Sequence, residues 1–169
     1  MDALGLTVLL TELEADCAVV ADAAGKAKAR LMEKSPGHLE ACAYELARLY
    51  NVMEKMFERI CEEFENHFEK RGDYHEKRIQ RLTLNLEEIR PGFIPKNRIQ
   101  KIRELKGFRH VTRHAYDLVL REDRLDELVS VAEEVAAAVP AWCNEFGEGV
   151  RAEQVGKIAI RNLFLIFDF

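Results

Sequence analysis

The sequence predicts an all-α protein, an up-and-down bundle of four or five helices. Along most of the chain, apolar residues recur every three or four positions, and this spacing gives a helix one apolar face. Only 9 Gly and 4 Pro interrupt the 169 residues, too few for an all-β protein that turns every ~8–12 residues. Hydrophobic residues make up 48% of the chain and charged residues 33%, a balance typical of a folded domain and not of a disordered chain.

The first three helices are separated by clear turn signals. The first is predicted over residues 4–31 and is followed by a Ser-Pro-Gly break at 35–37. The second is predicted over about 38–70 and ends at the Arg-Gly-Asp turn 71–73. The third is predicted over about 74–89, where its apolar stripe runs out before a loop bounded by two prolines.

The later part of the chain continues the same pattern up to a proline. The fourth helix is predicted over about 95–120 and the fifth over about 123–139, where Pro140 should kink or stop it. We therefore expect residues 1–140 to form the helical domain and residues 141–169 to form a C-terminal extension. The apolar end of this extension fits a helix, an edge strand or a segment packed on a partner, and the pattern leaves these three open.

Neither a secretory signal nor a membrane span is predicted. The first residues lack a basic region and a long apolar core. The longest strongly apolar stretch near the end, 163–167, is far shorter than the ~20 residues that cross a bilayer. We expect a cytoplasmic protein with no membrane partner.

The cysteines do not form a recognisable framework. No two of them are spaced as C-x-x-C, so they predict neither a zinc site nor a disulfide ladder. We expect reduced thiols that serve as small apolar residues. The four are Cys17, Cys42, Cys61 and Cys143.

The charge is unevenly distributed. The formal net charge is -5, so the whole chain gives no sign of a nucleic-acid partner. Between residues 95 and 114, however, seven basic residues stand against the single acid Glu104. A cationic helix of this kind can bind a polyanion locally, and Arg98, Lys101 and Lys106 are the candidate RNA contacts. A solvated helix face explains the charge run equally well.

The predicted fourth helix also carries a cluster of reactive side chains. Arg109, Arg113 and Tyr116 are spaced to share one helix face. His110 and His114 share another. Arg109 and His114 lie about 140° apart around an ideal helix. A single cleft can receive both groups if two copies of the helix face each other across a dimer axis.

These residue types suit RNA cleavage without a metal. A histidine with a pKa near neutrality can take the proton of a ribose 2′-hydroxyl. An arginine can stabilise the negative charge that gathers on the phosphate. Three other interpretations stay open at this point: a metal site formed by His110, His114 and Asp117, histidines that only cap or pair within the bundle, and a helix that binds anions without chemistry.

The same residues resemble a known family. Arg109-x4-His114 matches the R-x4-6-H motif of the HEPN superfamily, and with Tyr116 it matches the R-x4-H-x-Y form typical of HepT-like ribonuclease toxins. The segment 49–60 is also similar to the corresponding helix of one HepT-like subgroup. The resemblance covers about residues 41–128 in register.

The resemblance implies a helical bundle that dimerises through its motif helices and cleaves RNA, tRNA or mRNA, with no cofactor or metal. Arg109 and His114 would be the catalytic pair, supported by His110 and Arg113. It further implies a toxin whose partner is a minimal nucleotidyltransferase antitoxin, which can transfer AMP to the motif tyrosine, Tyr116.

The resemblance also places polar residues of the second predicted helix near the motif. Asn51 and Glu54 match positions that support the site in the family. We expect an endoribonuclease that cleaves by attack of the 2′-hydroxyl, as the toxin of a type II or AMPylation-controlled pair. The alternative is a noncatalytic HEPN module that binds a nucleotidyltransferase or nucleic acid, and a third interpretation is a helical oligomerisation protein.

Overall fold

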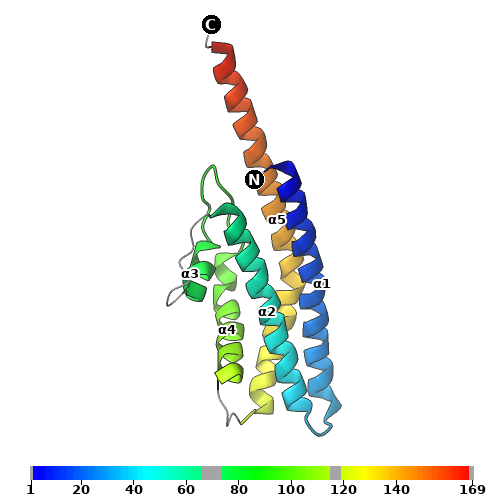
Figure 1. Ribbon diagram of the computed structural model, residues 1–169. Helices are drawn as coiled ribbons and strands as arrows, with labels where there is room; N and C mark the ends of the chain where they lie inside the picture. Colours follow the sequence, from blue (N-terminus) through cyan, green and yellow to red (C-terminus); the bar gives the residue numbers. More distant parts are fainter. Residues whose placement is uncertain (1, 66–73, 115–118, 168–169) are drawn as a thin grey trace.

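The computed structural model describes residues 2–65, 74–114 and 119–167, with side chains up to residue 156. This part of the chain is a bundle of α-helices joined by loops (Figure 1). The all-α prediction is confirmed. The helices are α1 (Ala3–Glu33), α2 (His38–Phe64), α3 (Tyr74–Arg81), α4 (Ile99–His114) and α5 (Glu122–Phe167), with a short 3-10 turn η1 (Lys96–Arg98) before α4.

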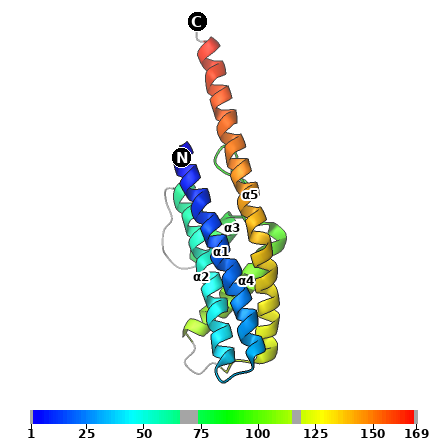
Figure 2. The same ribbon diagram turned by 90° about the vertical axis from the view of Figure 1, so that its right-hand side faces the viewer.

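Successive long helices run in opposite directions, as expected of an up-and-down bundle. α1, α2 and α5 lie side by side along most of their length, and α4 packs against α2 and α5 (Figures 1 and 2). The short α3 covers the outer side of α2 next to α4 (Figure 1). The family motif predicted in the fourth helix therefore lies on an outer helix of the bundle.

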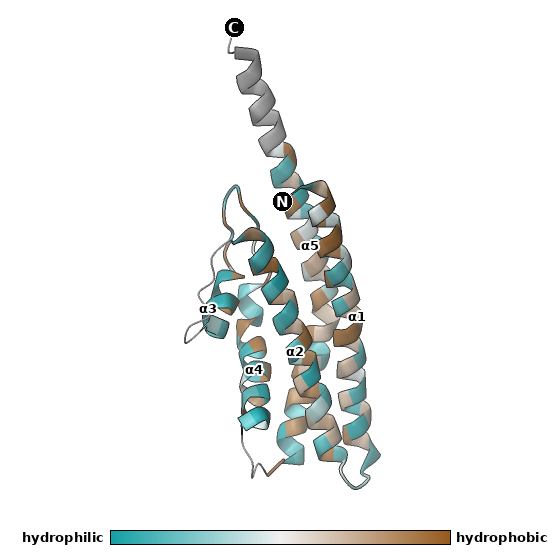
Figure 3. Ribbon diagram, in the orientation of Figure 1, coloured by the Kyte–Doolittle hydropathy of each residue, from teal (hydrophilic) through white to brown (hydrophobic). Residues whose placement is uncertain are grey.

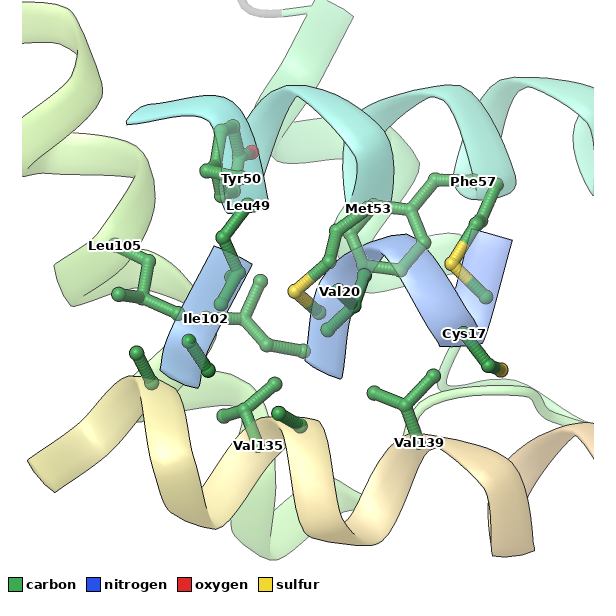
Figure 4. Packing of buried hydrophobic residues seen from close by; sticks show 14 of the residues in the cluster. Cys17, Val20, Leu49, Tyr50, Met53, Phe57, Ile102, Leu105, Val135 and Val139 are labelled. Carbon is green, nitrogen blue, oxygen red and sulfur yellow. The ribbon is translucent and has the colours of Figure 1, made fainter. Parts of the chain in front are cut away.

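The core is built from the apolar stripes of four helices. Figure 4 shows Val20 from α1, Met53 from α2 and Val135 from α5 pointing into one interior, and all three are fully buried. Hydrophilic residues lie on the outer sides of the helices, most densely on α3 and α4 (Figure 3). Each stripe repeats every three or four residues, which is why the sequence pattern located these helices.

The third helix is shorter than predicted. It ends at Arg81, and the following loop reaches Pro95 before η1 begins. Glu88 has a positive φ of 62° in this loop, and Ile89, predicted to be an apolar helix position, is 49% exposed. The guanidinium of Arg90 is fully buried, pairs with Glu65 and donates to the carbonyl oxygen of Arg81. The helical spacing predicted a helix here, but the carbonyl groups of this loop accept hydrogen bonds from the buried Arg90 in place of helical ones.

The fourth helix is also shorter than predicted. It begins at Ile99 and is described up to His114, whereas residues 119 and 120 are not helical. The segment 115–118 lies outside the described residues.

The fifth helix continues past the proline that was expected to kink or stop it. Pro140 lies inside α5, so the predicted helix end at this position is wrong. A proline removes one backbone hydrogen bond from a helix, at a cost of about 3 kcal/mol. Pro140 itself is exposed, whereas the next residues, Trp142, Cys143 and Phe146, are buried in the core. Their packing against α1 and α2 offsets the lost hydrogen bond.

The C-terminal part of α5 extends beyond the bundle. Its backbone is helical to Phe167, so the structure selects a helix among the three forms that the sequence left open. Both views show this end of α5 rising past the start of α1 (Figures 1 and 2). In the described part of the chain, no helix is sufficiently long and apolar to span a bilayer.

The cysteines occupy core positions, as predicted. All four are buried free thiols. The sulfur atoms of Cys17 on α1 and Cys143 on α5 lie 3.4 Å apart. Burial raises the pKa of Cys42 to about 11 and that of Cys61 to about 12. Their thiols are therefore protonated at neutral pH.

Candidate active site

Arg109 forms the centre of a polar contact between α4 and α2. Its Nε donates a hydrogen bond to Oδ1 of Asn51 at 2.8 Å. One of its terminal nitrogens donates to Oε2 of Glu54 at 3.3 Å. Asn51 and Glu54 lie three residues apart on α2 and so project from the same face. The structure brings together three of the residues that the sequence analysis selected, across more than 50 residues of chain.

Glu54 also contacts a residue from a third helix. Its other carboxylate oxygen, Oε1, lies 2.6 Å from Nδ1 of His75, in the first turn of α3. The side chain of Glu54 is only 16% exposed, whereas that of His75 is 48% exposed. Glu54 therefore bridges a guanidinium and an imidazole, and it fixes both with one partly buried carboxylate.

One side of Arg109 borders a charged cavity, which we call the α3 cavity. It has a volume of about 390 Å³. Glu76 from α3 receives hydrogen bonds from Arg103 and, at 2.9 Å, from Lys106. The hydrogen bond from Arg103 is the main reason that the pKa of Glu76 lies below its ordinary value. The residues that line the α3 cavity include Tyr50, Glu54, His75, Lys106, Arg109 and His110.

Tyr50 is a buried aromatic residue in the lining of this cavity. Its side chain is 1% exposed, and burial raises the pKa of its phenol. The hydroxyl therefore stays neutral over the physiological pH range and is not a candidate base.

The other side of Arg109 borders a second cavity, which we call the Tyr44 cavity. It has a volume of about 450 Å³ and lies between α2 and the end of α4. Tyr44 is 66% exposed there, and Arg113 is exposed as well. The residues that line it include Glu40, Tyr44, Asn51, Arg109, Thr112 and Arg113. Arg109 thus lies at the boundary of two cavities.

The two histidines of the motif lie on the outer face of α4. His110 and His114 are exposed, and their ring centroids lie 4.7 Å apart. His110 borders the α3 cavity. His114 is the last described residue of α4 and lines neither the α3 cavity nor the Tyr44 cavity. Within one chain, Arg109 and His114 are held on different faces, as the helix geometry predicts.

The candidate RNA-binding cations fall in two places. Lys106 borders the α3 cavity close to Arg109. Arg98 and Lys101 both pair with Glu134 on α5, Arg98 at 3.3 Å, and so lie on the side of α4 that faces α5. Tyr116, the candidate AMP acceptor, lies outside the described residues.

The structure adds two candidate residues that the sequence analysis did not select as site residues. His75 sits one turn before the buried Arg78 and Ile79, so it is the exposed end of a face that packs on α2. Tyr44 is a large aromatic residue that falls outside the apolar stripe of α2. Tyr44 deviates from the core pattern of its helix, and that deviation was the available signal.

The metal interpretation gains no support from the described residues. In that part of the chain, no three His, Cys, Asp or Glu side chains converge in a way that would hold an ion. Asp117, the third ligand considered from the sequence, lies outside it.

The fold and this arginine-centred site define a helical bundle of the HEPN type. A family model described as "HepT-like protein" matches residues 41–150, a segment that begins in α2 and includes every described candidate residue. The chain therefore belongs to the HepT-like family. α1 precedes the matched segment. Neither the curated proteins nor the solved structures contain a match to this chain.

Proposed function

We propose that this protein is a metal-independent endoribonuclease that acts as the toxin of a toxin–antitoxin pair. Its HepT-like family is associated with ribonuclease toxins of the HEPN type. The observation that carries the proposal is the position of Arg109: Asn51 and Glu54 hold it at the boundary of two cavities. A phosphate bound there has room for the adjoining nucleotide on each side.

The proposed reaction is an internal transesterification. His114 takes the proton of a ribose 2′-hydroxyl, and the 2′-oxygen forms a bond to the adjacent phosphorus. The bond from phosphorus to the 5′-oxygen breaks, and the leaving 5′-oxygen takes a proton from water, which leaves a 2′,3′-cyclic phosphate and a 5′-hydroxyl. General base catalysis of this kind contributes ~10²–10⁴ in rate.

Arg109 would stabilise the charge on the phosphate oxygens during this step. Because Asn51 and Glu54 already fix two of its nitrogens, the guanidinium is oriented before RNA binds. Arg113 lines the same cavity and adds a second positive charge. Lys106 and His110 supply polar groups on the other side.

A dimer through α4 would complete the site. Gly107, His110, Val111 and His114 are exposed and spaced along one stripe of α4, and Val111 is 44% exposed. A Cβ placed on Gly107 would meet nothing within 4 Å, so a second helix can approach closely there. Two α4 helices packed on this stripe would bring His114 of the partner subunit toward Arg109.

The antitoxin partner would be a minimal nucleotidyltransferase that acts on Tyr116. This part of the proposal rests on the R-x4-H-x-Y motif. An AMP group attached near the end of α4 would place a phosphate near Arg109 and Arg113, which line the same cavity. The phosphate would occupy these arginines and exclude RNA.

The decisive experiment is cleavage in the absence of metal. The chain, expressed without its partner and shown by intact mass to carry no AMP, is incubated with labelled tRNA and mRNA in excess EDTA. We expect cleavage that leaves cyclic-phosphate ends, with the rate at least 100-fold lower for Arg109→Ala and His114→Ala. Arg30→Ala, which alters an exposed ion pair within α1, is the matched control and should cleave normally.

Failure to cleave would favour a noncatalytic module. If the unmodified wild type cuts neither RNA while it still binds a nucleotidyltransferase or RNA, the ribonuclease proposal is wrong. Equal cleavage by the wild type and His114→Ala would remove the histidine from the mechanism.

A further inference from the structure

The Tyr44 cavity contains an exposed aromatic ring beside two arginines. Tyr44 is 66% exposed, although Tyr50 and Phe57 on the same helix are each 1% exposed. An isolated exposed tyrosine is ordinary on a protein surface. Tyr44 differs because it lines a cavity of about 450 Å³ that also contains Arg109 and Arg113.

The helix spacing places several of the residues that line this cavity on one face of α2. Tyr44, Ala47 and Asn51 follow one another at i, i+3 and i+7 on α2 and line the same cavity. The α2 residue that lines the cavity between Tyr44 and Asn51 is the small Ala47. Seven residues of α-helix span about 10 Å, roughly the reach of one nucleotide.

The charges within the cavity differ from one end to the other. Glu40 precedes Tyr44 by one helical turn, so the tyrosine end carries a carboxylate. Arg109 lies at the other end, where it contacts Asn51, and Arg113 also lines the cavity. A carboxylate repels a phosphate and accepts hydrogen bonds from the N–H groups of a base, whereas arginines attract phosphate. The cavity therefore favours one orientation of a nucleotide.

We propose that the Tyr44 cavity is a nucleobase subsite, in which the base next to the phosphate held by Arg109 stacks on the ring of Tyr44. This inference rests on the proposed ribonuclease function and extends it to the form of the substrate. A base paired in a duplex cannot present its face to a side chain, so the subsite requires a single-stranded or looped RNA. The tyrosine of the α3 cavity, Tyr50, is buried and presents no exposed ring.

The test is a binding measurement that does not depend on cleavage. The probe is a fluorescent single-stranded oligonucleotide of about ten nucleotides with 2′-deoxyribose throughout, which lacks the attacking hydroxyl. We expect Tyr44→Ala to weaken binding on the order of tenfold, the range of one lost base–aromatic stack. Tyr44→Phe and Tyr44→Trp should bind like the wild type, because both keep an aromatic face.

An abasic probe separates stacking from a general loss of binding. A series of oligonucleotides, each with one abasic position, should include one that weakens binding to the wild type about as much as Tyr44→Ala does. That same oligonucleotide should bind wild type and Tyr44→Ala equally. Circular dichroism checks folding, which this exposed position should not disturb.

The outcomes distinguish this inference from the proposed function. If the wild type cleaves RNA but Tyr44→Ala binds every probe as tightly as the wild type does, the subsite is wrong and the ribonuclease stands. If no RNA is cleaved but removal of one base still weakens binding to the wild type and not to Tyr44→Ala, the base subsite is supported and the protein is noncatalytic. Equal loss for Tyr44→Ala and Tyr44→Phe would overturn the stacking interpretation.

Discussion

Two helices of this bundle, α1 and α4, are held in place by opposite kinds of contact. α1 buries nine residues, all apolar, along the bundle axis. α4 buries only Ile102 and Leu105. Its remaining contacts with the other helices are largely polar, and they run to Glu76 on α3, to Asn51 and Glu54 on α2, and to Glu134 on α5.

This difference separates stability from function. Apolar burial supplies most of the free energy of folding, and α1 contributes to it along its whole length. Polar contacts at half-exposed positions stabilise the fold little, but they fix side chains in direction. α4 therefore carries the candidate site on a scaffold that α1, α2 and α5 hold together.

The largest effect on stability is expected from the apolar contacts of α1. Leu13 of α1 is fully buried, so Leu13→Ala leaves a cavity and should lower the free energy of unfolding by about 2–5 kcal/mol. Urea unfolding measures this change. RNA cleavage per folded molecule should stay at the wild-type level, and a specific loss of cleavage in the folded fraction would show that α1 influences the site.

Loss of a polar contact of α4 should lower cleavage and leave stability almost unchanged. Glu54→Gln removes the carboxylate that bridges Arg109 and His75 while it keeps a similar shape. We expect cleavage to fall on the order of 10- to 100-fold, with the free energy of unfolding changed by no more than about 1 kcal/mol. The pH–rate profile provides a further readout. A variant that unfolds as readily as Leu13→Ala would mean that Glu54 is structural.

Two glycines, one on α1 and one on α4, allow the two helices to be compared by substitutions that change the free energy of unfolding by about 1 kcal/mol. Gly25 on α1 and Gly107 on α4 are both helical and have nothing within 4 Å of a Cβ position. Replacing either with Gln should stabilise the monomer by about 0.5–1 kcal/mol through helix propensity. Sedimentation should show that only Gly107→Gln weakens the dimer. An unchanged dimer would exclude contact through this part of α4.

The apolar core should also show a pH dependence, of about the same size as the glycine effects. Burial raises the pKa of Cys42 to about 11 from an ordinary value of 9.0. Between pH 9 and pH 11 the Cys42 thiol has lost its proton in the unfolded chain but keeps it in the folded chain. The contribution of Cys42 to the free energy of unfolding is therefore fully present below pH 9 and is lost as the pH rises. The loss should be on the order of 1 kcal/mol by pH 10. Urea midpoints at pH 8 and pH 10 measure it, and Cys42→Ala should lack this component.

Much of the fold was predictable because helices are set by local spacing. The stripe of α1 from Leu6 to Leu31 is visible in the sequence and fully buried in the structure. The candidate motif was predictable in the same way, since Arg109 and His114 are positions on one helix. The errors fell at Arg90 and Pro140, where a buried ion pair and packing between helices outweighed local signals.

The sequence by itself determined where the long helices lie, which faces they bury and how far apart around α4 the two catalytic candidates lie. Only the tertiary structure decided which groups surround Arg109. Asn51 and Glu54 come from α2 and His75 from α3, and no periodicity links positions so far apart in the chain. Packing between helices also sorted the cations: it paired Lys106 with Glu76 of α3, and it paired Arg98 and Lys101 with Glu134 of α5. Helix faces follow from spacing along one element, whereas neighbours across elements follow from how complete faces pack together.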